Sequence, residues 1–92
     1  MINDAIHDFI AARKHLVWYV KNPRALDDEA IVEATLNYGN WDDVQKLIEI
    51  LGMEKVARIF RKQMIVGRQR GNYYPEVAHY FTLYFNKHVR MA

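Results

Sequence analysis

The residues of this chain that could bind a metal are four histidines and eleven acids, since there is no cysteine. Two pairs, Asp4 with His7 and Glu76 with His79, have the carboxylate–histidine spacing that di-iron helical bundles use. Such a centre also needs inward carboxylates from two further helices. The other clustered acids fall at expected helix starts, where capping explains them. We therefore expect no metal site and no cofactor.

Covalent catalysis lacks a suitable side chain. The chain contains neither serine nor cysteine, and Thr35 and Thr82 both fall within expected helical stripes. A covalent mechanism needs a nucleophile beside a base. The stretch from Gly67 to Gly71 also lacks the strand and the lysine–serine end of a phosphate-binding loop. We expect a protein without enzymatic activity.

Charge is segregated along the chain. From Asp27 to Glu54 there are eight acids and one base, a net charge of −7, whereas the stretch from Lys55 to Arg70 has six bases and no acid, a net charge of +6. These bases, called the basic set below, are Lys55, Arg58, Arg61, Lys62, Arg68 and Arg70. Such a run can contact phosphates or an acidic protein, although a solvated helix face is the simpler interpretation. Contact with six phosphates predicts a slope of about −5 for log K against log salt on duplex DNA.

Aromatic residues are concentrated near the C-terminus. We expect Phe81 and Phe85 to fill the core around the last helix. We expect Tyr73, Tyr74 and Tyr80 to be half-exposed, because half-exposed tyrosines are typical of protein interfaces.

The elements that must position these residues are expected to be helical. Helix-spaced apolar residues predict an N-terminal helix over Ile2–Ala12, helices over 28–38 and 41–51, a helix after Gly52 and a final helix from Pro75. Asp27 and Asn40 are suited to cap two of them, and Gly39 and Gly52 to follow helix ends in the left-handed conformation. Leu16–Val20 could be helical or extended. The prediction is one all-α domain over 1–92, a compact bundle of about five short helices.

Two further classes are disfavoured by the pattern. The longest apolar run, Leu16–Val20, is far shorter than the ~20 residues of a membrane span, and the acidic start is unlike a signal peptide, so we expect a cytoplasmic protein. A helix-turn-helix frame beginning at Gly52 places Arg58 where a buried aliphatic residue is required.

The chain resembles a small helical family of uncharacterised bacterial and archaeal proteins. The resemblance rests on His15-Leu-Val-Trp18, Ile31-Val32, Tyr38-Gly39-Asn40, Asp42-Asp43-Val44, Leu51-Gly52, Val56-Ala57, Pro75, Tyr80-Phe81 and Tyr84-Phe85, and it covers roughly Leu16 to Phe85. Members are commonly met as antitoxin-like partners beside nucleotidyltransferase toxins of the abortive-infection type. The resemblance implies no catalytic residues. Two departures are the basic segment from Met64 to Asn72 and the extra N-terminal helix.

The sequence therefore predicts a non-enzymatic protein-interaction module, antitoxin-like, that binds and neutralises a partner protein. The alternative is a nucleic-acid-binding helical protein that uses the basic set. A thin core and the half-exposed tyrosines also favour a homodimer. In one form of that dimer the acidic segment of each copy faces the basic segment of its mate. Otherwise the two segments neutralise each other within one chain.

Overall fold

The computed structural model describes residues 5–18, 20–66 and 73–89. These residues form five α-helices and two short 3-10 helices, with no β-strand among them, so the all-α prediction is confirmed. In chain order the elements are α1 (Ala5–Ala11), the 3-10 helices Lys14–Val17 and Pro23–Ala25, α2 (Asp28–Tyr38), α3 (Trp41–Leu51), α4 (Met53–Val66) and α5 (Pro75–His88). The limits of α2 and α3 agree with those predicted from the sequence.

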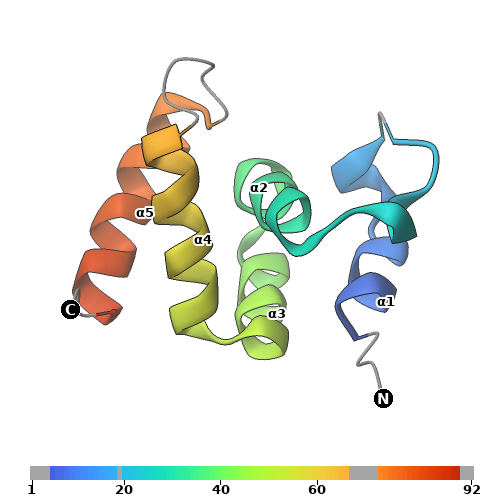
Figure 1. The fold of residues 1–92 in the computed structure, drawn as a ribbon, viewed down its shortest axis with the longest axis horizontal. Helices are drawn as coiled ribbons and strands as arrows, with labels where there is room; N and C mark the ends of the chain where they lie inside the picture. Colours follow the sequence, from blue (N-terminus) through green and yellow to red (C-terminus); the bar gives the residue numbers. More distant parts are fainter. Residues whose placement is uncertain (1–4, 19, 67–72, 90–92) are drawn as a thin grey trace.

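The helices are arranged in sequence order across the molecule. Figure 1 shows α4 between α3 and α5, with α4 running antiparallel to both, and α1 at the opposite end from α5. In the same view α2 is seen almost end-on, and it packs against both α3 and α4. Helix α4 therefore contacts α2, α3 and α5.

One contiguous apolar core draws residues from all five α-helices. Its largest fully buried side chains include Ile10 of α1, Ile31 of α2, Leu47 of α3, Phe60 of α4 and Phe85 of α5. Each lies on the helix-spaced apolar stripe of its own element, because a helix buries one face and exposes the other.

Local capping explains where α2 and α3 begin. The Asp27 side chain accepts a hydrogen bond from the backbone N–H of Ala30 at 2.9 Å. Asn40 and Asp43 form a capping box, in which each side chain accepts from the backbone N–H of the other at 2.8 and 3.1 Å. These bonds satisfy N–H groups that have no partner within the helix.

The two interhelical glycines differ in conformation. Gly52, which alone separates α3 from α4, has a φ of 94°, as predicted. The prediction for Gly39 was wrong, since its φ of −78° is ordinary extended backbone. Neither connection has the three or four residues of a helix-turn-helix turn.

The segment Leu16–Val20, left open by the sequence, is helical at its start. Leu16 and Val17 belong to the 3-10 helix Lys14–Val17 and are fully buried, whereas Trp18 is exposed. Residue 19 lies outside the described residues. Among those that are described, no helix combines the length and apolar composition that crossing a membrane requires.

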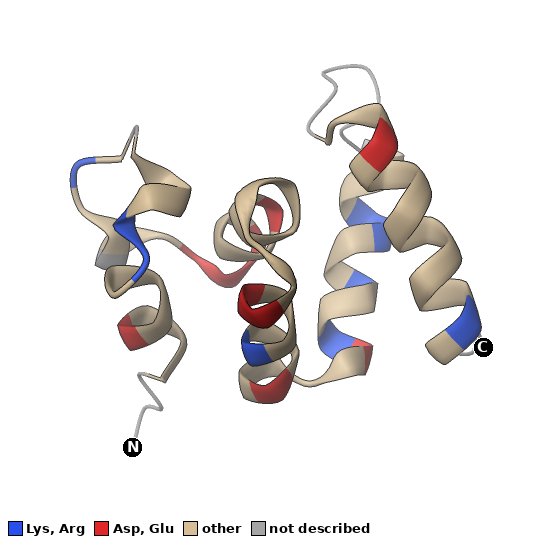
Figure 2. Cartoon of the chain, turned by 180° about the vertical axis from the view of Figure 1, so that it is seen from behind, with Lys and Arg blue, Asp and Glu red and all other residues tan. Residues whose placement is uncertain are grey.

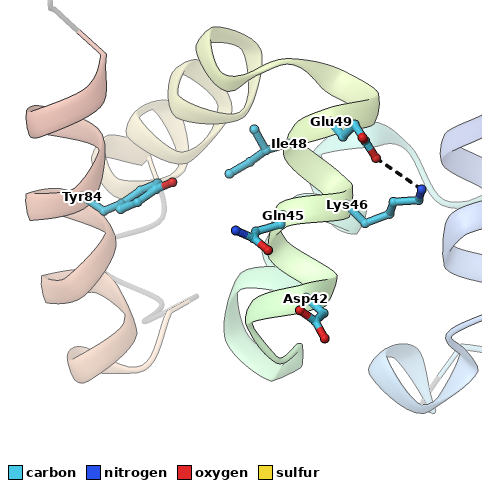
Figure 3. A pocket seen from close by; sticks show the side chains of 6 residues that line it. All are labelled: Asp42, Gln45, Lys46, Ile48, Glu49 and Tyr84. Carbon is cyan, nitrogen blue, oxygen red and sulfur yellow. Dashed lines mark ion pairs between the residues drawn. The ribbon is translucent and has the colours of Figure 1, made fainter.

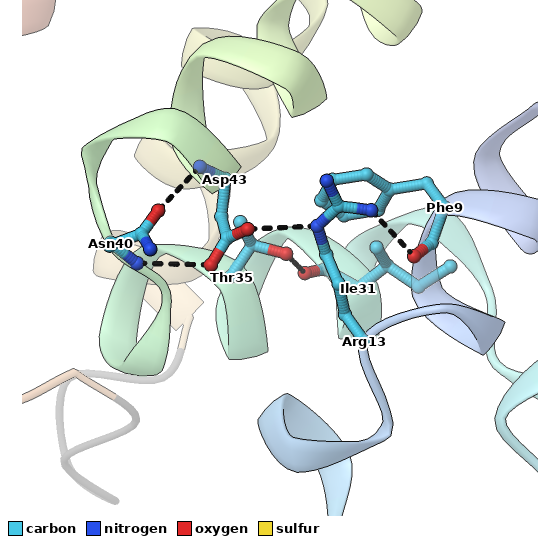
Figure 4. Close-up of polar contacts among 6 residues, drawn as sticks. All are labelled: Phe9, Arg13, Ile31, Thr35, Asn40 and Asp43. Atoms are coloured by element: carbon cyan, nitrogen blue, oxygen red, sulfur yellow. Dashed lines mark hydrogen bonds and ion pairs between the residues drawn. The ribbon is translucent and has the colours of Figure 1, made fainter.

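A charged contact joins the segment after α1 to the first turn of α3 (Figure 4). The Nε of Arg13 donates to Oδ1 of Asp43 at 2.8 Å, and its Nη1 donates to the carbonyl oxygen of Phe9 at 3.2 Å. The guanidinium also lies over the Phe9 ring, 4.2 Å from the centroid. Asp43 thus caps α3 and at the same time holds the segment that follows α1.

Candidate partner-binding surface

The described members of the basic set lie along α4, and the acids that face them lie on α2 (Figure 2). Lys55 forms an ion pair with Asp28 of α2 at 2.8 Å, and Lys62 forms one with Glu29 at 3.1 Å. These two ion pairs join the acidic and basic segments within one chain, which is the arrangement that the sequence offered as the alternative to a homodimer.

The Arg61 side chain forms hydrogen bonds with the C-terminal end of α5. Its Nη2 donates to the carbonyl oxygens of Phe85 and Val89 at 3.2 and 3.0 Å, and lies 3.4 Å from Oδ1 of Asn86. The last carbonyls of a helix lack intrahelical partners and carry partial negative charge, which a cation stabilises.

Arg58 is exposed, and among the described members of the basic set it alone forms no hydrogen bond or ion pair with the described residues. Arg68 and Arg70 lie outside the described residues. Three of the four described bases thus contact the protein itself. Binding of nucleic acid by the basic set stays a prediction, and it would compete with these intramolecular contacts.

The three predicted interface tyrosines do not share one environment. Tyr74 and Tyr80 are half-exposed, at 50% and 49%. Tyr73 was wrongly expected to be half-exposed, since only 7% of it is accessible. Its ring packs against Phe60, with centroids 5.1 Å apart, and its hydroxyl donates to the side-chain oxygen of Gln63. Burial raises the pKa of Tyr73, so its hydroxyl stays protonated.

Two groups of surface aromatic residues surround the exposed tyrosines. The Trp18 group contains Trp18, Tyr38 and Tyr74, whose consecutive ring centroids are 4.9 and 5.7 Å apart. The hydroxyls of Tyr38 and Tyr74 lie 3.2 Å apart and share a hydrogen bond. This group joins the segment after α1 to the end of α2 and the start of α5.

The Trp41 group contains Trp41 of α3 with Tyr80 and Tyr84 of α5. The Trp41 centroid is 6.3 Å from that of Tyr80 and 5.4 Å from that of Tyr84. The ring of His88 lies 4.4 Å from that of Tyr84, on the same helix. These contacts make side chains, rather than backbone, the bridge between α3 and α5.

A hollow of about 540 Å³ opens beside the Trp41 group. Figure 3 shows Tyr84 pointing from α5 towards Gln45 and Ile48 of α3. Asp42, Lys46 and Glu49 complete the lining, and the last two form an ion pair at 3.2 Å. The hollow is of a size that accepts a side chain or a short segment of a partner.

The carboxylate–histidine pairs are not gathered into a ligand set. Asp4 lies outside the described residues, and the Nε2 of His7 is 3.1 Å from the carbonyl oxygen of Leu26. Glu76 and His79 are both exposed on α5. Over the described parts of the chain, no group of three or more histidines and acids is placed to hold a metal ion.

No family model matches this chain, and neither does any curated protein or solved structure. The resemblance to antitoxin-like proteins therefore stays a prediction, carried by the residues on which it rests.

Trp18, Trp41 and Tyr38 were not predicted from the sequence to be interface residues. Trp18 is 64% exposed and Trp41 is 41% exposed, although tryptophan is usually well buried. The sequence contains an indication that Tyr38 and Trp41 are exposed. Tyr38 and Trp41 flank the predicted Gly39–Asn40 connection, and large side chains at a helix junction often remain at the surface because the helix stripe does not enclose them.

Proposed function

We propose that this protein is a non-enzymatic protein-interaction module, antitoxin-like, that binds and neutralises a partner protein through its exposed aromatic residues. The observation that carries the proposal is the identity of the exposed apolar side chains. Of the seven large ones at the described surface, five are tryptophan or tyrosine. These residue types are enriched at protein interfaces, where they also supply much of the binding energy.

The arrangement of these residues supports the same function. The Trp18 and Trp41 groups hold their rings edge to face, so the contact surface is ordered before a partner arrives. A preformed surface loses less side-chain entropy on binding than a flexible one. The basic set supports the nucleic-acid alternative less well, because Lys55, Arg61 and Lys62 have contacts within the chain.

The resemblance names the class of partner, a nucleotidyltransferase toxin of the abortive-infection type. The experiment is to express the chain together with the product of an adjacent nucleotidyltransferase gene. We expect the two proteins to purify as a complex and cells to be rescued from growth arrest. Failure of both complex formation and rescue would contradict the proposal.

Matched variants locate the interface. Trp41→Ala combined with Tyr80→Ala should weaken the complex at least about tenfold, since each is an aromatic anchor. Ile65→Ala is the control, because Ile65 is a large exposed apolar residue on α4 that belongs to neither aromatic group. Equal weakening by the control would place the contact elsewhere.

A further inference from the structure

Helix α5 has an exposed stripe on the side away from its buried residues, Phe81 and Phe85. The residues of this stripe, called the α5 seam below, are all exposed and are Glu76, Tyr80, Leu83 and Lys87. At 3.6 residues per turn they lie within about 60° of one another around the helix axis. Figure 1 shows α5 at one edge of the molecule, beside α4. The α5 seam is therefore open to a further molecule.

The middle of the α5 seam is apolar. Leu83 is 57% exposed and Tyr80 is 49% exposed. The Tyr80 ring also contacts Trp41 and Phe81, with centroids 6.3 and 5.0 Å away, so its accessible half is held in one orientation. The four seam residues follow one another at spacings of four, three and four, which is the spacing of residues that pack between two helices in a coiled coil. This pattern favours another helix as the occupant.

The two ends of the α5 seam carry opposite charges. Glu76 lies in the first turn of α5 and Lys87 in the last, and neither forms a hydrogen bond or ion pair with the described residues. An antiparallel copy of the same helix would place Lys87 opposite Glu76 at both ends, and Leu83 opposite Tyr80 in the middle. A parallel copy would instead place each charge opposite its own kind. The seam is thus complementary to itself in the antiparallel direction alone.

We propose that the α5 seam binds the α5 seam of a second copy of this chain, as an antiparallel pair related by a two-fold axis. Such a contact is reciprocal, so each apolar and each charged contact occurs twice. Exposed ion pairs contribute little free energy, so the apolar middle supplies the affinity and the charges select the orientation. A seam of about 20 Å is short, and the dimer belongs to the weak class that buries less than about 1,200 Å².

This inference goes beyond the proposed function and does not depend on it. Tyr80 belongs both to the α5 seam and to the Trp41 group, so a partner bound at the Trp41 group competes with the second copy. Leu83 belongs to the seam alone. Variants at Leu83 therefore act on self-association without removing a residue of the Trp41 group.

The first test is sedimentation equilibrium of the chain by itself, from ~20 μM to ~1 mM, a range suited to a weak dimer. We expect a monomer at the low end and a dimer at the high end. Leu83→Glu should raise the Kd at least about tenfold, because it buries a charge in the apolar middle. Thr82→Glu is the matched control: it adds the same charge at the next exposed residue of α5, about 100° around the helix from Leu83, and should leave the Kd unchanged.

The second test measures the orientation of the pair by disulfide formation. The chain has no cysteine, so the only thiols are those introduced. Glu76→Cys mixed with Lys87→Cys should form a disulfide between the two proteins on oxidation. Glu76→Cys alone should not, because its two copies would lie roughly 16 Å apart along an antiparallel pair, beyond the ~7 Å that a disulfide spans between Cα atoms.

Several outcomes overturn the inference. A monomer at ~1 mM, a Kd unchanged in Leu83→Glu, or equal weakening in Thr82→Glu would reject the α5 seam as the contact. Disulfide formation by Glu76→Cys alone, as fast as in the mixture, would reject the antiparallel pair. Both tests use the chain without its partner, so their result is separable from that of co-expression with a toxin.

Discussion

Asp43 has two structural roles on one carboxylate. One oxygen accepts from the backbone N–H of Asn40, and the other accepts from Arg13. Burial by itself raises the pKa of this carboxyl. The hydrogen bonds from Arg13 and Asn40, with the positive charges of Arg13 and His15, outweigh burial and leave the pKa below the ordinary 3.8.

Asp43→Asn should lower the free energy of unfolding by roughly 1–3 kcal/mol at neutral pH, since it weakens a charge-assisted hydrogen bond. A folded-state pKa below the unfolded value means that the stabilisation is complete above 3.8 and is lost as the pH falls through the folded pKa. Urea unfolding at several pH values measures this difference.

Asp42→Asn is the matched control, because it removes the same charge from the same helix turn without breaking a described contact. Equal losses for the two variants would show that helix-end charge, not the Arg13 contact, is responsible. A loss for Asp43→Asn that persists in acid would contradict the assigned protonation.

The two interhelical glycines should both resist substitution, for different reasons. In Gly52→Ala the new methyl group would meet nothing within 4 Å, but the backbone has a positive φ that L-residues disfavour. We expect thermal and urea unfolding to show a loss of about 1–2 kcal/mol. In Gly39→Ala the backbone is ordinary, yet the new carbon would lie 2.7 Å from the Thr35 carbonyl oxygen.

Gly39→Ala should therefore lower the free energy of unfolding because of the clash with the end of α2, and not because of backbone strain. A D-alanine at position 52, introduced by chemical synthesis, should retain wild-type stability because D-residues favour positive φ. The same replacement at position 39 should not. Unchanged stability in Gly52→Ala would show that the α3–α4 connection is described wrongly.

At the scale of helices, α5 is attached at both ends by different chemistry. Tyr73, just before α5, packs on Phe60 and bonds to Gln63, which in turn donates to the Glu29 carbonyl oxygen at 2.8 Å. At the other end Arg61 supplies the hydrogen bonds that the last carbonyls of α5 lack. Both attachments come from α4, so α4 positions Tyr84, the aromatic residue of α5 that lines the hollow.

Arg61→Ala should lower the free energy of unfolding by about 1 kcal/mol, because partly exposed charge-assisted hydrogen bonds are lost. It should also increase amide hydrogen exchange in the last turn of α5, over residues 86–89. Arg58→Ala removes an exposed cation from the same helix and should change neither quantity. Loss of protection along the whole of α5 would instead indicate that Arg61 stabilises the helix globally.

At the scale of the whole molecule, the charge pattern bears on self-association. Lys55 and Lys62 are paired with acids of their own chain. A homodimer in which the acidic segment of one copy pairs with the basic segment of the other would have to break these ion pairs. The homodimer stays a prediction, and the surface best suited to it is the exposed aromatic one.

Light scattering at low and high salt tests this form of association. We expect a dimer that persists when salt is raised from ~0.1 to ~0.5 M, although the Debye length falls from ~10 Å to about half of that or less. Tyr74→Ala with Tyr80→Ala should weaken it, because burial of aromatic area is insensitive to salt. Dissociation by salt would instead favour the dimer in which the acidic segment of each copy faces the basic segment of its mate. A monomer at high concentration would contradict both forms of the dimer.

Much of this protein was determined by local sequence alone. The limits of α2 and α3 follow from caps, glycines and apolar spacing that act within a few residues. The all-α fold follows for the same reason, because each of five segments has helix-spaced apolar residues that predict a helix without reference to the other segments. Phe81 and Phe85 were assigned to the core correctly, since each lies at the centre of its helix stripe.

Tertiary structure decided which surface residues are available to a partner. No acid interrupts the basic set in the sequence, but the fold places Asp28, Glu29 and the end of α5 beside its members on α4. Tyr73 lies next to exposed Tyr74 in the chain, yet only the packing of α5 on α4 buries it. The ring contact between Trp41 and Tyr84 joins α3 to α5, and no local pattern encodes a contact between side chains so far apart in the chain.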